Sequence, residues 1–288
     1  MDLCIVIVSW NVRERLRTCL ESIAAHAGNL THEVVVVDNA SSDGSAEMVR
    51  DAFPRVRCIG NDTNRGFAAA CNQGIAAAHD AAFVLLLNPD MRVLPGALPD
   101  MVAFMQEERN ARVGVAGCRL LDEHGAVLPH VRRFPELADQ LALLMKVPHV
   151  FPRVLDRYLV RDFDYAREAR VDSLRGSFFC IRRRVIDDIG LLDDHFFLWF
   201  EEVDFCKRAH DAGWEIAYTP RVSCVDAVGR SFAQVRRSAK QRIFTQSMVR
   251  YFGKHHAPWK RAVLAFVRPF AIGTTRIADL WQRSPSNS

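Results

Sequence analysis

Small polar and acidic side chains follow each of four predicted strands in the first 90 residues. In chain order these are Ser9 and Asn11, Asp38, Asn64 and Gly66, and Asn88 and Asp90. Any one group has an ordinary explanation as a turn, because Asn and Asp bond their own backbone and Pro89 fixes φ. Four such strand ends favour a shared pocket, since ligands of open α/β sheets bind outside the carboxyl ends of the strands.

The elements that would carry these groups alternate between strand and helix. Apolar or β-branched runs predict strands at 3–8, 33–37, 55–59, 83–87 and 113–120. Helical spacing predicts helices at 12–27, 45–52, 67–79 and 95–109. The run FVLLL at 83–87 does not alternate, which is typical of a strand buried on both faces. The pattern predicts an α/β fold with a mainly parallel central sheet flanked by helices.

The chemistry of the strand ends indicates a nucleotide diphosphate. No GxGxxG follows a strand and no GxxxxGK[ST] occurs, so dinucleotide and P-loop sites are not expected. Acids repel bare phosphate, and a divalent cation would have to lie between them. Asp90 could join diphosphate oxygens through Mg²⁺ or Mn²⁺, which take carboxylates together with substrate oxygens. Asp38 could accept a hydrogen bond from a pyrimidine ring N–H.

A second group of candidates lies between residues 174 and 213. A strand is expected at 174–181, and Gly176 and Ser177 within it suggest close approach of a ligand or a bulge. Glu201, Glu202 and Asp204 then fall in the first turn of a helix expected at 201–213. These acids could merely complement the helix dipole, at about 0.3–1 kcal/mol each. Alternatively one is a general base whose pKa is raised by aromatic neighbours such as Trp199.

The series IVIVSWN, EVVVVDNASSDGS, NDTNRGFAAACNQGI and FVLLLNPD resembles the family 2 glycosyltransferases of GT-A fold. Within that family it is most similar to the bacterial rhamnosyltransferase-like branch, over about residues 3–231. The resemblance implies Asp38 at the nucleobase, Asp90 at the metal, and Asn88 where many relatives carry the first Asp of a DxD. Further nucleotide contacts are implied for Ser9, Asn11, Asn64, Gly66 and Asn72.

In the second half the resemblance implies the acceptor site and the base. By position Glu202 corresponds to the base, with Glu201 as the second choice; relatives usually have Glu-Asp there. Gly176, Ser177, Trp199 and Asp204 are expected around the sugar or acceptor. Asp226 stands where relatives often place a metal-contacting His, and a carboxylate is also a competent ligand for a hard cation. Mg²⁺ or Mn²⁺ is the implied cofactor.

The implied activity is inverting transfer of a sugar from a nucleoside-diphosphate sugar to a hydroxyl of a cell-surface glycan or lipid-linked acceptor. Rhamnose is the sugar that this branch favours. Two alternatives stay open. A sugar-phosphate nucleotidyltransferase would want a Gly-rich basic loop where Ser9-Trp10-Asn11 stands. A non-catalytic nucleotide-sugar binder would fit the departures at Asn88, Glu202 and Asp226.

The end of the chain is strongly basic. Residues 229–288 hold 12 Lys and Arg against the single acid Asp279, and helical spacing from 233 to 281 mixes these cations with bulky apolar residues. The face could be simply solvated, or it could lie on an anionic membrane. No nucleic-acid motif accompanies it, so no nucleic-acid partner is expected.

The organisation that we expect has three parts. Residues 1–120 form a nucleotide-sugar-binding half, 121–232 an acceptor-binding and catalytic half, and 233–288 a basic helical extension. Eight cysteines without a CxxC pair, and the lack of a signal-peptide pattern or an apolar run of spanning length, favour a cytoplasmic protein. A peripheral position at the inner face of the cytoplasmic membrane would suit the basic extension.

Overall fold

A mixed sheet forms the centre of the molecule, whose computed structural model describes residues 1–78, 80–227 and 235–281. The strands of the described part run in the order β3-β2-β1-β4-β8-β6-β9-β5, with β7 also paired to β9. Their bounds are β1 Leu3–Ser9, β2 His32–Asp38, β3 Arg57–Gly60, β4 Phe83–Leu87, β5 Met91–Val93, β6 Val113–Leu121, β7 Ala169–Arg170, β8 Phe178–Arg182 and β9 Glu215–Asp226. The four strands from β3 to β4 are parallel, and β8 joins them antiparallel.

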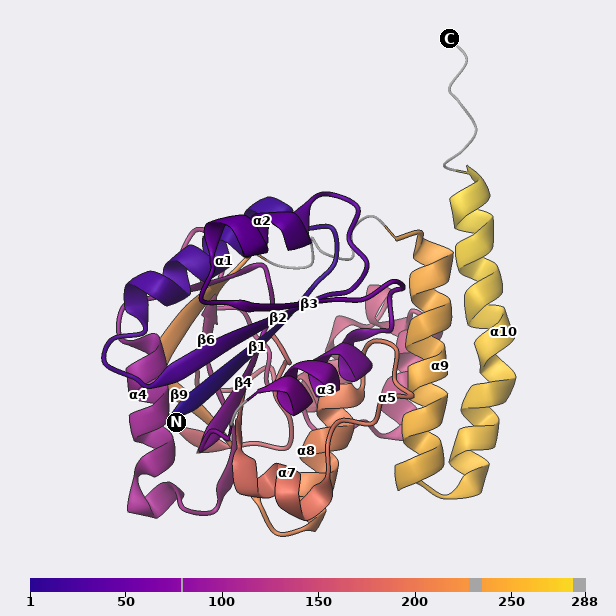
Figure 1. Cartoon of the computed structure of the whole chain (residues 1–288). Coiled ribbons are helices and arrows are strands. Elements are labelled where there is room, and N and C mark those ends of the chain that lie inside the picture. The colour runs from indigo at the N-terminus through magenta and orange to yellow at the C-terminus, as the bar shows by residue number, and fades with distance from the viewer. Residues whose placement is uncertain (79, 228–234, 282–288) are drawn as a thin grey trace.

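Helices cover both faces of this sheet (Figure 1). α1 (Arg13–His26), α2 (Ser45–Ala52) and α4 (Ala97–Gln106) pack on the face that carries Leu3, Ile5 and Ile7 of β1. α3 (Phe67–Ala77), α7 (Arg183–Ile189) and α8 (Glu201–Asp211) pack on the face that carries Cys4 and Val6. Alternate residues of β1 therefore enter opposite cores, which explains why its sequence is apolar throughout.

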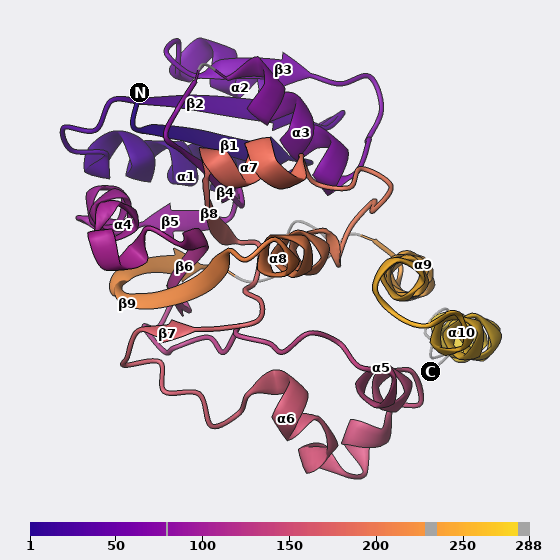
Figure 2. The same cartoon turned by 90° about the horizontal axis from the view of Figure 1, so that it is seen from below.

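A third core joins the C-terminal helices to the rest of the chain. α5 (Leu137–Leu144), α9 (Arg237–His255) and α10 (Pro258–Trp281) meet there, and Phe196 and Phe200 reach it from the segment before α8. α9 and α10 lie side by side next to the sheet, and from below α5 is seen beside α10 (Figures 1 and 2). The remaining short helices, η1 Glu108–Asn110, η2 Val147–His149, η3 Pro152–Leu155 and α6 Asp156–Leu159, lie in connecting segments.

The predicted α/β architecture is confirmed, and the strands and helices expected in the first 120 residues form within a few residues of their predicted bounds. One expectation was wrong: the strand expected from residue 174 begins at Phe178, so Gly176 and Ser177 lie in the loop before it. Pairing with β4 explains the shift, because the ladder ends at Leu87 opposite Phe178. β5, directly after the Asn-Pro-Asp turn, was not predicted.

Two further features bear on the expectations. None of the helices within the described ranges has both the length and the apolar character needed to cross a membrane. The expected boundary at residues 232 and 233, and the Gly229-x-Ser231 motif, lie outside the described residues.

Gly74 of α3 allows this helix to lie directly on β1. A Cβ at this position would collide with the Cγ1 atom of Val6, which is fully buried on β1. We expect Gly74→Ala to destabilise the fold by about 1–3 kcal/mol, because overpacking outweighs the better helix propensity of Ala. Urea unfolding followed by circular dichroism measures the change.

Gly273 of α10 provides the matched control, since no described atom lies within 4 Å of a Cβ built there. Gly273→Ala should be neutral or slightly stabilising. Equal stability of the two variants would contradict the close packing of α3 on β1.

Candidate active site

A pocket of about 330 Å³ opens at the carboxyl ends of β1 and β4. The parallel pairing of β1 with β2 and β4 brings these strand ends to one edge of the sheet. The pocket is lined by the following predicted site residues: Asn64, Gly66, Asn88, Asp90, Gly176, Ser177, Trp199, Glu201 and Glu202. Nine candidates from four separate stretches of sequence therefore share one cavity.

The Asn-Pro-Asp stretch after β4 is both a turn and a wall of this pocket. The Met91 amide donates to the Asn88 carbonyl at 3.2 Å, which closes the turn, and the Asn88 amide donates to the Ser177 carbonyl at 3.0 Å. The turn thus fixes Asp90 at the base of the pocket and ties it to the loop before β8. Residues 88–90 can therefore form a turn and a wall of a ligand pocket at the same time.

Asp90 lies beside a second buried acid, Asp226. The pairing of β5 with β9 places Met91 opposite Asp226, and only 7% of Asp90 and 1% of Asp226 are exposed. Burial raises the pKa of Asp90, and the negative charge of Asp226 raises it further. Two buried carboxylates that repel one another, with further oxygen donors nearby, fit a hard divalent cation, which would relieve the repulsion.

Two glutamates line the same pocket from the first turn of α8, Glu201 buried and Glu202 half-buried. Glu201 and Glu202 each have their Oε2 atom buried without a hydrogen-bond partner among the described residues. Burial raises the pKa of both carboxyls, and the charge of Glu202 raises that of Glu201 well above its usual range. Arg175 opposes this effect at Glu202. Of the two carboxylates, Glu202 is the one whose ionised form the charge of Arg175 favours.

The backbone before α8 is held in an unusual conformation. Trp199 and Phe200 both have left-handed φ angles, 66° and 71°, which are costly for bulky residues. Phe200 is buried in the third core, and Trp199 lines the pocket. Packing against α9 thus sustains a turn that aims the first residues of α8 at the cavity.

One wall of the pocket is made by two loops that dock on each other. Gly66 has φ +86°, and a Cβ there would lie 2.6 Å from the carbonyl oxygen of Phe197. The Phe67 amide donates to that same oxygen at 2.7 Å. Asn39, which was not predicted, organises the loop: its amide donates to Asn64 and to the Gly66 carbonyl, and its Oδ1 accepts from the Arg65 amide. In the sequence, the position of Asn39 directly after Asp38 could have indicated this role.

Ser9, Asn11 and Asp38 lie at the neighbouring strand ends but do not line the pocket. Ser9 pairs with Asp38 in the register of β1 and β2. Asp38 accepts from the Ser41 amide through Oδ2, while its Oδ1 and the Ser9 hydroxyl are buried without a hydrogen-bond partner among the described residues. Asn11 accepts from the Ser42 amide and so shapes the loop after β2.

Asn72 and Asp204 serve the structure away from the pocket. Both polar groups of the Asn72 amide bond the backbone of Leu192. Asp204 is fully buried and paired with Arg208 of its own helix and with Lys254 and His255 of α9. Burial alone would raise the pKa of Asp204, but these donors outweigh it and lower the pKa. We therefore correct the expectation that these two side chains face the ligand: their polar groups are committed to the protein itself.

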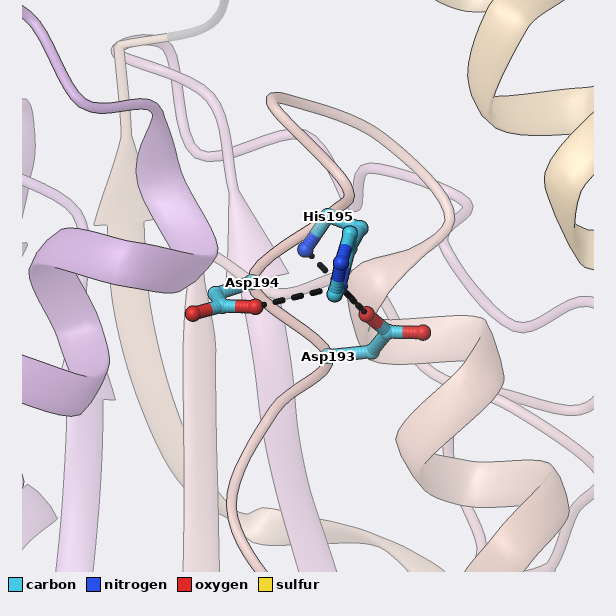
Figure 3. A group of neighbouring side chains, drawn as sticks. All are labelled: Asp193, Asp194 and His195. Carbon is cyan, nitrogen blue, oxygen red and sulfur yellow. Dashed lines mark hydrogen bonds and ion pairs between the residues drawn. The ribbon is translucent and has the colours of Figure 1, made fainter.

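A separate acidic cluster, Asp193, Asp194 and His195, lies in the loop before α8 (Figure 3). The ring Nδ1 of His195 lies 3.0 Å from Asp193 and 3.2 Å from Asp194. Asp193 is also held by Arg250 and Lys254 of α9, each at 2.8 Å. Because protein cations already surround this carboxylate, the cluster fastens the loop to α9 and is a poorer cation site than Asp90 and Asp226.

Sequence reasoning missed two basic residues that line the pocket. Arg175 precedes Gly176 in the loop before β8, and Lys240 comes from α9. Arg175 was next to a motif already singled out, whereas only the fold brings Lys240 to the site.

The comparisons with known proteins agree with this geometry. Residues 4–158, more than half of the chain, match the family model described as glycosyl transferase family 2. The chain belongs to this family. It is a glycosyltransferase that uses a nucleotide sugar, as predicted.

Among curated family 2 relatives, the chain is similar to N-acetylglucosaminyl-diphospho-decaprenol L-rhamnosyltransferase of Mycobacterium tuberculosis. The two are 26% identical over 271 residues, which cover 90% of this chain and 87% of the relative. Rhamnosyltransferase WbbL of Escherichia coli is 22% identical over 225 residues, 75% of this chain and 80% of its own. The predicted likeness to rhamnosyltransferases is confirmed.

Solved structures confirm the GT-A fold. The mannosyltransferase PcManGT from Pyrobaculum calidifontis, in complex with GDP-Man and Mn²⁺, superposes with a TM-score of 0.59 at 20% identity, covering 100% of this chain and 76% of its own. The structure of Staphylococcus aureus TarS 1-349 in complex with UDP-GlcNAc superposes with a TM-score of 0.57 at 16% identity. The match covers 93% of this chain and 70% of the TarS chain.

The ion pairs of Asp204 make a prediction about stability. Asp204→Asn removes the buried carboxylate that pairs with Arg208 and Lys254 and contacts His255, and we expect it to cost about 3–5 kcal/mol at pH 7. The folded-state pKa is lowered, so this stabilisation is present above the unfolded Asp pKa of about 3.9 and is lost as pH falls below it. The stability difference from wild type should therefore shrink between pH 7 and about pH 3 in urea unfolding.

Asp211→Asn is the control on the same helix, because its pair with Lys207 is half exposed. Such a surface pair contributes at most about 1 kcal/mol. Equal costs for the two substitutions at pH 7 would contradict the buried ionic link between α8 and α9.

Proposed function

We propose that this glycosyltransferase is metal-dependent and inverting, and that it transfers rhamnose from a nucleoside-diphosphate sugar to a hydroxyl of a lipid-linked glycan acceptor. One observation carries the proposal. Asp90, Glu201 and Glu202 line the same cavity, and Asp226 lies beside Asp90 where β5 pairs with β9, so a pair of carboxylates suited to a divalent cation is close to a pair suited to base catalysis. This arrangement supplies both requirements of a single displacement: a stabilised leaving group and a base for the nucleophile.

Asp90 and Asp226 would hold Mg²⁺ or Mn²⁺. The bound cation would neutralise the charge that develops on the diphosphate as it leaves. Asn88 offers an amide oxygen beside Asp90 without adding charge. Ser9 and Asp38 lie opposite each other at the neighbouring strand ends and would receive the nucleoside, with Asp38 Oδ1, which has no hydrogen-bond partner among the described residues, accepting from the base.

Glu202 would take the proton from the acceptor hydroxyl at Oε2 as that hydroxyl attacks the sugar. Glu201 would hydrogen-bond Glu202 and keep it oriented. Gly176 lies beside Glu202, since a Cβ built at Gly176 would be 3.7 Å from the Glu202 Cβ, an ordinary contact distance. Ser177 and Trp199 line the remaining space and would contact the sugar or the acceptor.

The names of the relatives support the choice of sugar and acceptor. Two of the curated relatives are rhamnosyltransferases, and the mycobacterial one is named for an acceptor carried on decaprenol diphosphate. The mannosyltransferase neighbour is a complex with Mn²⁺, which supports the choice of cation class.

A lipid-linked acceptor would place the enzyme at a membrane surface, and the C-terminal helices support this. Phe266 and Phe270 of α10 are 73% and 66% exposed and contact each other. Three strongly exposed apolar residues, Met145, Val150 and Phe151, follow α5, which packs on α10. No acid occurs between residues 235 and 278 of this region. We propose that this surface rests on anionic lipid at the inner face of the cytoplasmic membrane.

Glu202→Gln tests the proposed chemistry. We expect transfer from the productive donor, identified among dTDP-rhamnose, UDP-sugars and GDP-sugars, to fall about 10²- to 10⁴-fold in kcat while donor binding is retained. In the wild type kcat/KM should decline as pH falls, beginning above the pH at which an ordinary Glu titrates, because the pKa of Glu202 is raised. Initial rates across pH measure both effects.

Glu201→Gln is the matched control, because an amide can still donate a hydrogen bond to Glu202. It should retain more activity than Glu202→Gln. The opposite ranking would assign the base to Glu201, and no turnover by the wild type with any donor would favour the alternative of a non-catalytic binder.

Phe266→Ser with Phe270→Ser tests the membrane surface. We expect the double variant to lose most of the wild-type binding to phosphatidylglycerol vesicles in co-sedimentation, while its circular dichroism and melting temperature stay close to wild type, because both side chains are largely in solvent. Binding should also weaken at high salt. Unchanged binding to these vesicles, or equal binding to neutral phosphatidylcholine, would contradict the proposal.

A further inference from the structure

Arg175 lines the pocket together with Asp90, Glu201 and Glu202, and it also reaches Asp226. Its guanidinium is 3.5 Å from Asp226 Oδ2, and it lines the same cavity as Asp90 and Glu202. Its charge lowers the pKa of both of those carboxyls. The positive charge of Arg175 therefore acts on Asp90 and Asp226 and also on Glu202.

The contact between Arg175 and Asp226 is loose. At 3.5 Å it is longer than the 2.7–2.9 Å usual for a charge-assisted hydrogen bond, and 38% of the Arg175 side chain is exposed. Arg182, at the end of β8, shows the contrast: its guanidinium donates to the carbonyls of Val113, Met105 and Asn110 at 2.6–3.1 Å. Arg182 is fixed by the fold, whereas Arg175 is free to exchange one anionic partner for another.

A divalent cation at Asp90 and Asp226 would compete with Arg175 for Asp226. Two positive charges at one carboxylate repel each other, so a bound cation would weaken the contact between the guanidinium and Asp226. A diphosphate brings oxygens that match the fork of an Arg side chain, and it would lie next to the cation. Arg175 is thus positioned to pass from a protein acid to the donor.

We propose that Arg175 couples cation binding to donor binding: it pairs with Asp226 before the cation arrives and with the diphosphate of the donor afterwards. The inference rests on the proposed function, because it takes Asp90 and Asp226 as the cation site. It gives Arg175 two effects of opposite sign. It weakens binding of the cation alone, and it strengthens binding of the nucleoside diphosphate in the presence of the cation.

Isothermal titration of Arg175→Gln tests both signs without a turnover assay. Mn²⁺ alone should bind about 3- to 10-fold more tightly than to wild type, because Asp226 is released. The nucleoside diphosphate that wild type binds, among UDP, dTDP and GDP, should bind about 10- to 100-fold more weakly at saturating Mn²⁺. The affinity for the matching nucleoside monophosphate should fall by a smaller factor than the affinity for the diphosphate. Arg175→Lys keeps the positive charge but loses the forked guanidinium. Its affinity for the nucleoside diphosphate should therefore lie between those of wild type and Arg175→Gln.

Arg15→Gln controls for a general loss of positive charge. Arg15 also lowers the pKa of Asp90 by its charge, and it lines a second cavity that includes Asp90 but not the cavity lined by Arg175. The Arg15→Gln variant should bind the nucleoside diphosphate with an affinity close to that of wild type.

Weaker binding of both Mn²⁺ and diphosphate to Arg175→Gln, or no change in either, would overturn the inference. So would equal effects of the two substitutions on diphosphate binding. If wild type itself binds none of the diphosphates with any cation, the proposed function fails, and the inference fails with it.

Discussion

The mutual repulsion of buried carboxylates is the constraint on which this site depends. Asp90 and Asp226 meet where β5 pairs with β9, and Glu201 and Glu202 begin α8 at the same cavity. Carboxylates buried beside one another in a medium of low polarity cannot all stay ionised without a counter-charge. Burial and the charge of the neighbouring acid raise the pKa of Asp90 and of Glu201, whereas Arg175 opposes the rise at Asp90 and Glu202 and contacts Asp226. A divalent cation would complete this neutralisation and make the pocket suited to an anionic donor.

The rest of the fold serves to hold these acids together. Parallel pairing sets the strand ends in line, and the loop after β3 docks through Gly66 against Phe197. The strained turn at Trp199 and Phe200 is sustained by the third core. α9 belongs to this support, since it grips the loop before α8 through Asp193 and the helix itself through Asp204. The C-terminal helices therefore position the candidate base as well as offering an exposed apolar surface.

The sequence was informative where a local pattern has one physical meaning. The apolar runs of β1, β2 and β4 predicted buried strands. Of the polar groups after these strands, Asn88 and Asp90 line the pocket, whereas Ser9, Asn11 and Asp38 lie at the neighbouring strand ends. The sequence was less informative about residues whose contact partners lie far away along the chain. Asp204 follows Glu202 by two positions and so lies on nearly the opposite side of α8, facing α9, but the sequence did not show what packs on either side. Asn39, Arg175 and Lys240 reach the site through contacts between segments far apart in the chain.

The central claim is that the acid after β4 and the acid ending β9 form the cation site that receives the donor. Anomalous X-ray diffraction from crystals grown with Mn²⁺ and the bound nucleoside diphosphate tests it most directly. We expect a manganese peak between the carboxylates of Asp90 and Asp226, in contact with diphosphate oxygens. A peak at Asp193, Asp194 and His195 instead, with the nucleotide away from the β4 end, would contradict it.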